Sequence, residues 1–563
     1  MVVYYPLRDA VRNRAIYRET NRTVWLYHTA VPFFLLPLYI PVDLWYTVIN
    51  DTTDRRKTLS RPNNLFITTD EQHLRTLSCY GCRTETTPCL DALADNADVY
   101  ETAYTVSPVC LPARCAFMTG MYPHHSGSIS NIFGASLSLQ FPNLFTELKK
   151  QGYRTALHGK CHFIPVPYPA TRGDMTLEYE HFIAYYKLLG MDKLSLQDDK
   201  NNSLWYYDDY AKDLARQGML RKCRYEAHEN PENHGYYDFP FETPMHPDAW
   251  VGQRAVEDIE SRSADENNFI WVSFSGPHYP VDTPAEYTDR IDENKLEPRI
   301  FREDEWDDDS KYHVRGYHGP GTTEGSGHAK DGAQKNYSED YWIQWRRRYF
   351  GNIALIDEWV GKILDAARAK FGENLLVIFT ADHGEMMGNH SLWGKNGALF
   401  EDVLRIPLIV QRPGQKEGRR IPETVSSLEL FPTILTCAGA PVPDHADGVT
   451  LDEMVQQGGR PFIISECDNR AVILKDGVKV EYNRPNLRGK TYRELYDLRE
   501  DPDEFENRFE DPRYAGTIRE LTALLEAEPD LMETVFRPYA DGGDYWLNDG
   551  TGAGFAFNGA KPE

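Results

Sequence analysis

The sequence predicts an α/β protein built on a large mixed, mostly parallel β-sheet that is sandwiched by helices. Apolar, β-prone runs at residues 64–69, 268–274 and 375–380 each lead into polar residues, as buried parallel strands do at an active-site edge. Segments with helical periodicity, such as residues 341–370, lie between them. With 563 residues, the chain can bury a large core and form more than one domain.

The charge balance restricts the class of partner. The sequence has 61 Lys and Arg against 86 Asp and Glu, a formal charge of −25, which argues against nucleic acid as a partner. An anionic substrate would have to be captured by a local cluster of cations. The nine cysteines are an odd number in a long chain and do not indicate a disulfide framework.

The N-terminal 61 residues contain a basic segment, residues 8–22, and an apolar run, residues 31–42, that superficially resemble a signal peptide. The run is cut by three prolines and is shorter than the roughly 20 residues that span a bilayer. We therefore expect residues 1–61 to form a packing arm, within the monomer or across a homo-oligomer interface. We expect a cytoplasmic protein without membrane association.

The first predicted strand, residues 64–69, ends at Asp70 and Glu71. Carboxylates at this position can cap the next helix, or they can bind a metal at the edge of the sheet. The spacing alone leaves both interpretations open.

Cys110 follows an extended segment, residues 99–106, and begins a short helical stretch that ends at Gly120. A residue at a helix N-terminus faces free backbone N–H groups, which favour anions. Arg114 lies one helical turn later, on the same face. The pattern pairs a nucleophile position with a cation, although a reactive thiolate or a buried small apolar residue would also fit.

Three further predicted strands lead into polar residues that carry charge or a titratable ring. Lys160 and His162 follow a strand after the helix at residues 141–151, and His278 follows the strand at residues 268–274. The strand at residues 375–380 leads to Asp382 and His383, with Lys395 further on. Taken singly, such residues are usually solvated loop groups.

The rest of the chain sets the predicted domain organisation. We expect residues 62–455 to form one domain with insertions near 190–250 and 300–340, whose loops would line any substrate pocket. From about residue 461 the pattern changes to short strands, followed by a helix near residues 517–527. We expect a second unit at residues 456–536 and a tail rich in Gly and aromatic residues at 537–563.

The words Cys-Leu-Pro-Ala-Arg at residues 110–114 and Thr-Gly-Met-Tyr-Pro-His-His-Ser-Gly at 119–127 resemble the signature of the formylglycine-dependent (type I) sulfatases of the alkaline phosphatase superfamily. Gly-Lys-Cys-His at residues 159–162 and Ala-Asp-His at 381–383 resemble further words of this family. Ala113, Glu71 and Cys161 depart from its commoner residues. The resemblance covers roughly residues 62–510.

This resemblance implies an alkaline phosphatase-like fold with a smaller C-terminal α+β domain that carries an antiparallel sheet. It implies that a formylglycine-generating enzyme oxidises Cys110 to formylglycine. It also implies one divalent metal, with Ca²⁺ the family default and Mn²⁺ or Mg²⁺ open because of the histidine nitrogen. The implied ligands are Asp70, Glu71, residue 110, Asp382 and His383.

The family roles carried over to the other residues concern the transferring group. Arg114, Lys160, His278 and Lys395 would surround the sulfate, with Lys395 and His278 assisting the departing alcohol. Asp382 would help to accept the nucleophile's proton, and His162 would help to break the covalent intermediate. Asn131 adds either a substrate contact or a structural loop amide.

The leading functional prediction is arylsulfatase-type hydrolysis of sulfate esters. The first alternative is hydrolysis of phosphonate monoesters or phosphodiesters, which would use the same nucleophile and metal. Lys160 and His162 favour sulfate, because the related phosphonate hydrolases typically carry non-basic residues there. A non-catalytic anion-binding protein with unoxidised Cys110 is the remaining alternative.

Overall fold

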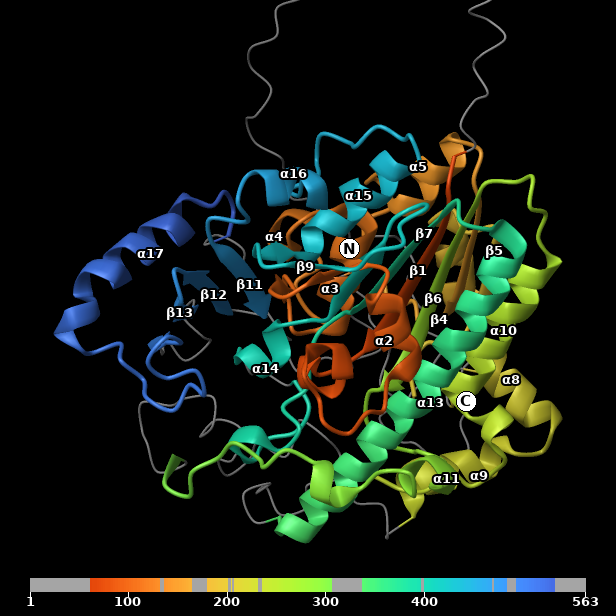
Figure 1. Cartoon of the computed structure of the whole chain (residues 1–563), viewed down its shortest axis with the longest axis horizontal. Helices are drawn as coiled ribbons and strands as arrows, with labels where there is room; N and C mark the ends of the chain where they lie inside the picture. Colours follow the sequence, from red (N-terminus) through yellow and green to blue (C-terminus); the bar gives the residue numbers. More distant parts are fainter. Residues whose placement is uncertain are drawn as a thin grey trace, which may run out of the picture. The chain divides into compact units, whose positions relative to one another are not determined.

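The computed structural model describes residues 61–131, 136–164, 180–200, 204, 207–230, 235–305, 337–395, 399–467, 470–483 and 493–531 (Figure 1). The predicted N-terminal arm lies outside these residues except for its last position. The central part of the predicted insertion at 300–340 and the tail at 537–563 also lie outside them.

The main sheet has eight strands, and most neighbouring pairs are parallel. β8 is antiparallel to both of its neighbours, so the sheet is mixed, as predicted. In spatial order the strands are β5 (Lys193–Leu196), β4 (Arg154–Gly159), β6 (Asn268–Pro277), β1 (Asn63–Asp70), β7 (Leu375–Ala381), β8 (Leu408–Gln411), β2 (Asp98–Tyr100) and β9 (Arg419–Ile421).

The register of the central strands brings their carboxyl ends to one edge. Asp70 at the end of β1 pairs with Pro277 at the end of β6, and Thr69 pairs with Ala381 at the end of β7. Gly159 at the end of β4 pairs with Ser273. The residues that follow these strands therefore emerge side by side, which is how a parallel sheet builds a site.

Helices cover both faces of this sheet, because alternate residues of each buried strand point to opposite sides. Ile67 and Val272 share one apolar cluster with α2 (Pro88–Ala94), α10 (Pro247–Ser261) and α13 (Glu339–Phe371). Phe66 and Trp271 share another cluster with α3 (Cys110–Thr119), α5 (Leu144–Lys150) and α15 (Leu430–Cys437). Each apolar cluster joins one face of the sheet to its helices, which gives the predicted sandwich. Figure 1 shows α10 and α13 along the sheet.

The predicted insertion at residues 190–250 is folded where the structure describes it. It contributes β5 to the sheet edge and the short helices α8 (Asp209–Arg216) and α9 (Leu220–Arg224), followed by a π-helical turn, η3 (Tyr225–Glu229). Leu214 of α8 packs into the same cluster as α10. Because these helices are only one or two turns long, the sequence shows no sustained period there.

A second, antiparallel sheet confirms the predicted fold of the C-terminal part. It comprises β11 (Ile463–Cys467), β12 (Arg470–Lys475), β13 (Val478–Asn483) and β14 (Arg493–Asp497), and α17 (Ala515–Ala527) packs on it. The backbone N–H of Glu466 donates to the carbonyl of Val106, at 2.8 Å. The second sheet therefore supports the segment that leads into α3.

All nine cysteines are free thiols. Among the described residues, no helix combines the length and apolar character that crossing a bilayer requires. The other strands and helices are β3 (Ala103–Tyr104), β10 (Val425–Ser426), α4 (Pro123–Ser126), α6 (Glu180–Leu188), α11 (Ala285–Thr288), α14 (Glu401–Leu404) and α16 (Leu451–Gln456).

Candidate active site

Cys110 occupies the first position of α3 and is buried. Its Sγ lies 3.3 Å from Nε2 of His383 and 3.5 Å from Oδ1 of Asp70. Burial alone would raise the pKa of this thiol, but the positive charges of Lys160, Lys395 and His383 outweigh burial and hold it well below its usual value. The structure therefore places the predicted nucleophile in a strongly cationic setting.

Asp70 stands at the end of β1 and is fully buried. Its Oδ2 pairs with the Lys160 ammonium group, and its Oδ1 lies 3.4 Å from Nε2 of His383. Burial and the nearby Cys110 would raise its pKa, but Lys160, His278 and Lys395 together bring it below its usual value. Asp70 is therefore an ionised oxygen ligand at the centre of the site.

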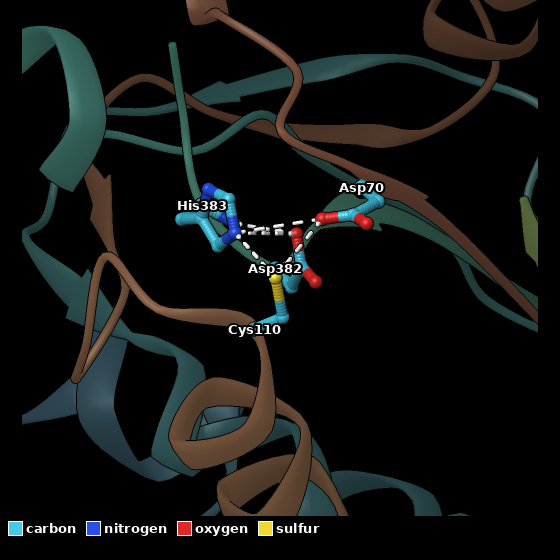
Figure 2. A group of neighbouring side chains, drawn as sticks. All are labelled: Asp70, Cys110, Asp382 and His383. Carbon is cyan, nitrogen blue, oxygen red and sulfur yellow. Dashed lines mark hydrogen bonds and ion pairs between the residues drawn. The ribbon is translucent and has the colours of Figure 1, made fainter. Parts of the chain in front are cut away.

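Asp382 and His383 follow β7 and complete the group around Cys110 (Figure 2). Oδ1 of Asp382 accepts hydrogen bonds from the backbone N–H groups of Glu71 (3.1 Å) and His383 (2.9 Å). Nδ1 of His383 lies 3.0 Å from the Gly384 carbonyl, so its Nε2 points toward the sulfur. Burial opposes protonation of His383, but Asp382 and Cys110 raise its pKa to about 9.

Four potential metal ligands meet at this point. One atom from each of Asp70, Cys110, Asp382 and His383 lies within 4.8 Å of the others, and all four residues are buried. Two carboxylates and an imidazole suit a divalent cation. The donor set therefore fits the metal that the sequence predicted.

Glu71, predicted as a fifth ligand, takes a different position. Its Oε2 lies 2.9 Å from Nζ of Lys395 and 3.0 Å from Nε2 of His278. It belongs to a second potential ligand group with Asp70 and His278, and not to the group that contains Cys110. Burial raises the pKa of Glu71 to about 8, although His278 and Lys395 pull the other way.

The side chains of Lys395 and His278, which were predicted to act on the same leaving group, lie in contact. Nζ of Lys395 donates to Nε2 of His278 at 2.6 Å, and Nδ1 of His278 lies 2.6 Å from the Tyr279 carbonyl. Both side chains are almost fully buried. An ammonium group backed by an imidazole can supply a proton to an oxygen.

Arg114 is held behind the nucleophile by three hydrogen bonds. Its Nε donates to Oδ2 of Asp382 at 2.8 Å, and its Nη1 donates to Oγ of Ser273 at 2.7 Å and to the Lys160 carbonyl at 3.0 Å. Its Nη2 has no hydrogen-bond partner among the described residues. That N–H group is a donor that an anion beside Cys110 could use.

His162 and Asn131 are also brought to the nucleophile. The backbone N–H of His162 donates to Oδ1 of Asp198 at 2.8 Å, and a hydrogen bond from its ring helps to lower the pKa of Cys110. Oδ1 of Asn131 accepts the backbone N–H of Leu111 at 2.9 Å, so this amide contacts the first turn of α3.

Sequence reasoning missed several residues that shape the site. Asp199 lies 3.5 Å from Nζ of Lys160, and the Tyr349 hydroxyl donates to the Glu71 carbonyl at 2.5 Å. The carboxylates at 198 and 199 follow a strand end just as Asp70 does, so the same signal could have found them. The side chains of Ser273 and Tyr349 carried no signal, because a serine in a strand and a tyrosine in a helix are ordinary.

Fold and site together define a mixed α/β protein whose buried cysteine stands between lysines and other potential metal ligands. The sequence model of the Sulfatase family matches residues 62–440. The chain therefore belongs to the sulfatase family, which confirms the prediction of a sulfuric ester hydrolase.

Individual relatives extend over most of the chain. An uncharacterised sulfatase of Escherichia coli K12 is 28% identical over 508 residues, covering 85% of this chain and 90% of that protein. An arylsulfatase of Clostridium perfringens is 26% identical and covers 86% and 96%. The crystal structure of a phosphonate monoester hydrolase of Agrobacterium radiobacter superimposes with a TM-score of 0.67 at 22% identity, covering 83% and 95%. That likeness confirms the alkaline phosphatase-like fold.

Proposed function

We propose that this chain hydrolyses sulfate esters with a formylglycine hydrate, made from Cys110, as the nucleophile. The observation that carries the proposal is the surroundings of the Cys110 sulfur, which stands where the hydroxyl groups of the hydrate would be. It lies 3.3 Å from His383 and 3.5 Å from Asp70, and Lys160 and Lys395 lower its pKa. One side chain can therefore meet a metal and a transferring anion together.

The metal would be held by Asp70, Asp382, His383 and residue 110, the four that converge. Glu71 could join through the second ligand group that it forms with Asp70 and His278. The carboxylate oxygens support Ca²⁺, and the imidazole nitrogen also allows Mn²⁺ or Mg²⁺. When bound, such an ion lowers the pKa of the hydroxyl nucleophile.

The first step joins one hydrate oxygen to sulfur and breaks the bond between sulfur and the alcohol oxygen. Asp382, whose pKa is raised by burial and by neighbouring Asp70, accepts the hydroxyl proton. Arg114 and Lys160 neutralise charge that spreads over the sulfate oxygens, the main requirement of such a displacement. The departing alcohol takes a proton from the Lys395–His278 pair, whose nitrogens are 2.6 Å apart.

The second step regenerates the nucleophile. His162 takes the proton of the remaining hydroxyl, the aldehyde C=O forms, and the bond between that carbon and the sulfate oxygen breaks. Sulfate leaves without attack of water on sulfur, and water then adds to the aldehyde. The ring of His162 is suited to this role because it hydrogen-bonds the residue at position 110.

The alternative substrates are phosphonate monoesters and phosphodiesters. Lys160 and His162 support sulfate, because the related phosphonate hydrolases typically carry non-basic residues at these two positions. We further propose maturation by a formylglycine-generating enzyme. The homo-oligomer, the cytoplasmic location and the domain boundaries near residues 61, 455 and 536 stay predictions from the sequence.

The test compares kcat/KM for 4-nitrophenyl sulfate, a phenylphosphonate monoester and a phosphate diester, after mass spectrometry has confirmed conversion of Cys110. We expect the sulfate to have the highest value and Cys110→Ala to be inactive. Cys115→Ala is the matched control, because Cys115 is a buried thiol of the same helix that packs in the apolar core and is not one of the four residues that converge at position 110. A phosphonate or diester with the highest value would contradict the substrate assignment.

A further inference from the structure

We propose that His124, His125 and Glu528 form a second metal site, which binds one divalent transition-metal ion such as Zn²⁺. The four converging residues of the candidate active site, Asp70, Cys110, Asp382 and His383, are called the Cys110 cluster. The second site is separate from this cluster and shares no residue with it. The proposal does not depend on the proposed function.

The three residues come from two distant parts of the chain. His124 and His125 lie in α4, and Glu528 directly follows α17. One ligand atom from each lies within 4.8 Å of the others, and the two imidazole rings have centroids 4.1 Å apart. Two imidazoles and one carboxylate are a ligand set that zinc commonly adopts.

The separation of the ligand atoms suits a shared ion better than a hydrogen bond. Nε2 of His124 lies 3.7 Å from Oε1 of Glu528, too far for a hydrogen bond. Two ligands at about 2.0–2.1 Å from a tetrahedral ion are themselves about 3.4 Å apart. Nε2 of His124 is buried and has no hydrogen-bond partner among the described residues. An ion would satisfy this orphaned nitrogen.

A second layer of carboxylates orients both imidazoles. Nδ1 of His124 lies 2.6 Å from Oε1 of Glu466, and Nδ1 of His125 lies 2.8 Å from Oδ2 of Asp447. Metal-binding histidines almost always engage a carboxylate or carbonyl with the ring nitrogen that does not bind the metal. The ring nitrogen left for a ligand is therefore Nε2 in each residue.

Carboxylates line this cluster, and they also favour a cation. Three carboxylates, those of Asp447, Glu466 and Glu528, face two imidazoles. The guanidinium of Arg460 donates to the hydroxyl of Tyr122, whose ring stacks on His124, and its Nε donates to Oε1 of Glu429 at 3.0 Å, so its charge is shared with Glu429. The side chains of His125 and Glu528 are each 20% exposed, which gives an ion access from solvent.

Bound metal would connect the end of the C-terminal helix to the helix that follows the nucleophile helix. The competing interpretation is a metal-free cluster in which a protonated His124 lies between Glu466 and Glu528. Metal would stabilise the folded chain by mass action, whereas the metal-free cluster would not respond to zinc.

The experiment titrates the full chain with Zn²⁺ and measures bound zinc by elemental analysis, for the wild type, His125→Asn and Glu528→Gln. Glu526→Gln is the matched control, because Glu526 is an exposed carboxylate of α17 outside the cluster. We expect both cluster variants to bind one zinc ion fewer, or to bind it at least tenfold more weakly, than the wild type and Glu526→Gln. Turnover of 4-nitrophenyl sulfate should be retained.

Two further readouts keep the proposal falsifiable. Co²⁺ should give visible absorption bands in the wild type that are lost in Glu528→Gln, and Zn²⁺ should raise the melting temperature of the wild type more than that of this variant. Equal zinc content and equal melting shifts in wild type, Glu528→Gln and Glu526→Gln would overturn the proposal. So would a wild type that binds no zinc beyond the Cys110 cluster.

Discussion

The Cys110 cluster and the group of His124, His125 and Glu528, called the His124 cluster, use similar ligands but differ in the cations that surround them. Each brings histidine together with carboxylates from distant elements. Around Cys110, Asp70 is paired with Lys160 and Asp382 with Arg114, while Lys395 pairs with the neighbouring Glu71. Around His124, the nearby guanidinium of Arg460 is already paired with Glu429. We therefore expect the interleaved cations to let the Cys110 cluster receive an anion as well as a metal.

The two clusters also differ in how they are built. The first gathers the ends of parallel strands and the start of a helix, whose relative positions the sheet register sets. The second joins a four-residue helix to a residue just beyond another helix. We therefore expect substitutions in the first to change chemistry and those in the second to change metal content and stability.

The largest expected effect separates the clusters completely. Cys110→Ala removes the nucleophile, and kcat/KM for a sulfate ester should fall by at least about 10⁴-fold, as loss of a nucleophile does elsewhere. Zinc bound at the His124 cluster should be unchanged. The check is an assay and a zinc analysis of the same preparation. Activity within about a hundredfold of wild type would contradict the role of residue 110.

The next prediction concerns the cations that distinguish the first cluster. Lys160→Met and Lys395→Met should each lower kcat by about 10²–10³-fold, because each removes a charge that stabilises the transition state. Lys193→Met is the control, since Lys193 pairs with Asp258 and is 42% exposed. Steady-state kinetics of the three variants check this prediction. Equal kcat values in all three would mean that Lys160 and Lys395 do not stabilise the transition state.

A smaller effect is expected for a residue that positions Arg114. Ser273→Ala removes the hydroxyl that accepts a hydrogen bond from Nη1 of Arg114 at 2.7 Å. Because a lost hydrogen bond to a charged group costs about 1.5–3 kcal/mol, kcat/KM should fall about 10- to 100-fold. Ser275→Ala is the control from the same strand, because the Ser275 hydroxyl has no partner among the described residues. Saturating substrate should not restore the rate of Ser273→Ala, because the loss is expected in kcat. The two constants, kcat and KM, should therefore be measured separately.

The smallest effect concerns the support behind the first cluster. Burial would raise the pKa of Asp402, but hydrogen bonds from His73 and Asn389 lower it from 3.8 to about 2. Because the folded pKa is depressed, this stabilisation is present above about pH 4 and is lost as the pH falls towards 2; it amounts to about 2 kcal/mol. The unfolding free energy of Asp402→Asn should therefore approach that of wild type in acid.

Thermal unfolding between about pH 6 and pH 3 checks this prediction, since the window approaches the depressed pKa from above. Asp289→Asn is the control, because Asp289 is exposed just after α11. A gap between wild type and Asp402→Asn that stays constant over this range would mean that the hydrogen bonds of Asp402 do not depress its pKa.

The strand ends and the motif spacing could be predicted from the sequence. Runs of apolar residues define β1, β6 and β7 to within a few positions, and the carboxyl ends of parallel strands must meet at one edge. That rule places Asp70, His278 and Asp382 together without any coordinates. The family words added Cys110 and Lys395, and family membership confirmed the class of enzyme.

Side-chain direction was decided only by the tertiary structure. Glu71 has a φ of 62°, an uncommon left-handed conformation, and its carboxylate lies with His278 and Lys395, outside the group around Cys110. The contact between His124 and Glu528 depends on the packing of the C-terminal sheet beside α3. Periodicity and local spacing report which residues leave an element, but the partners they meet are set by long-range packing, which no local pattern encodes.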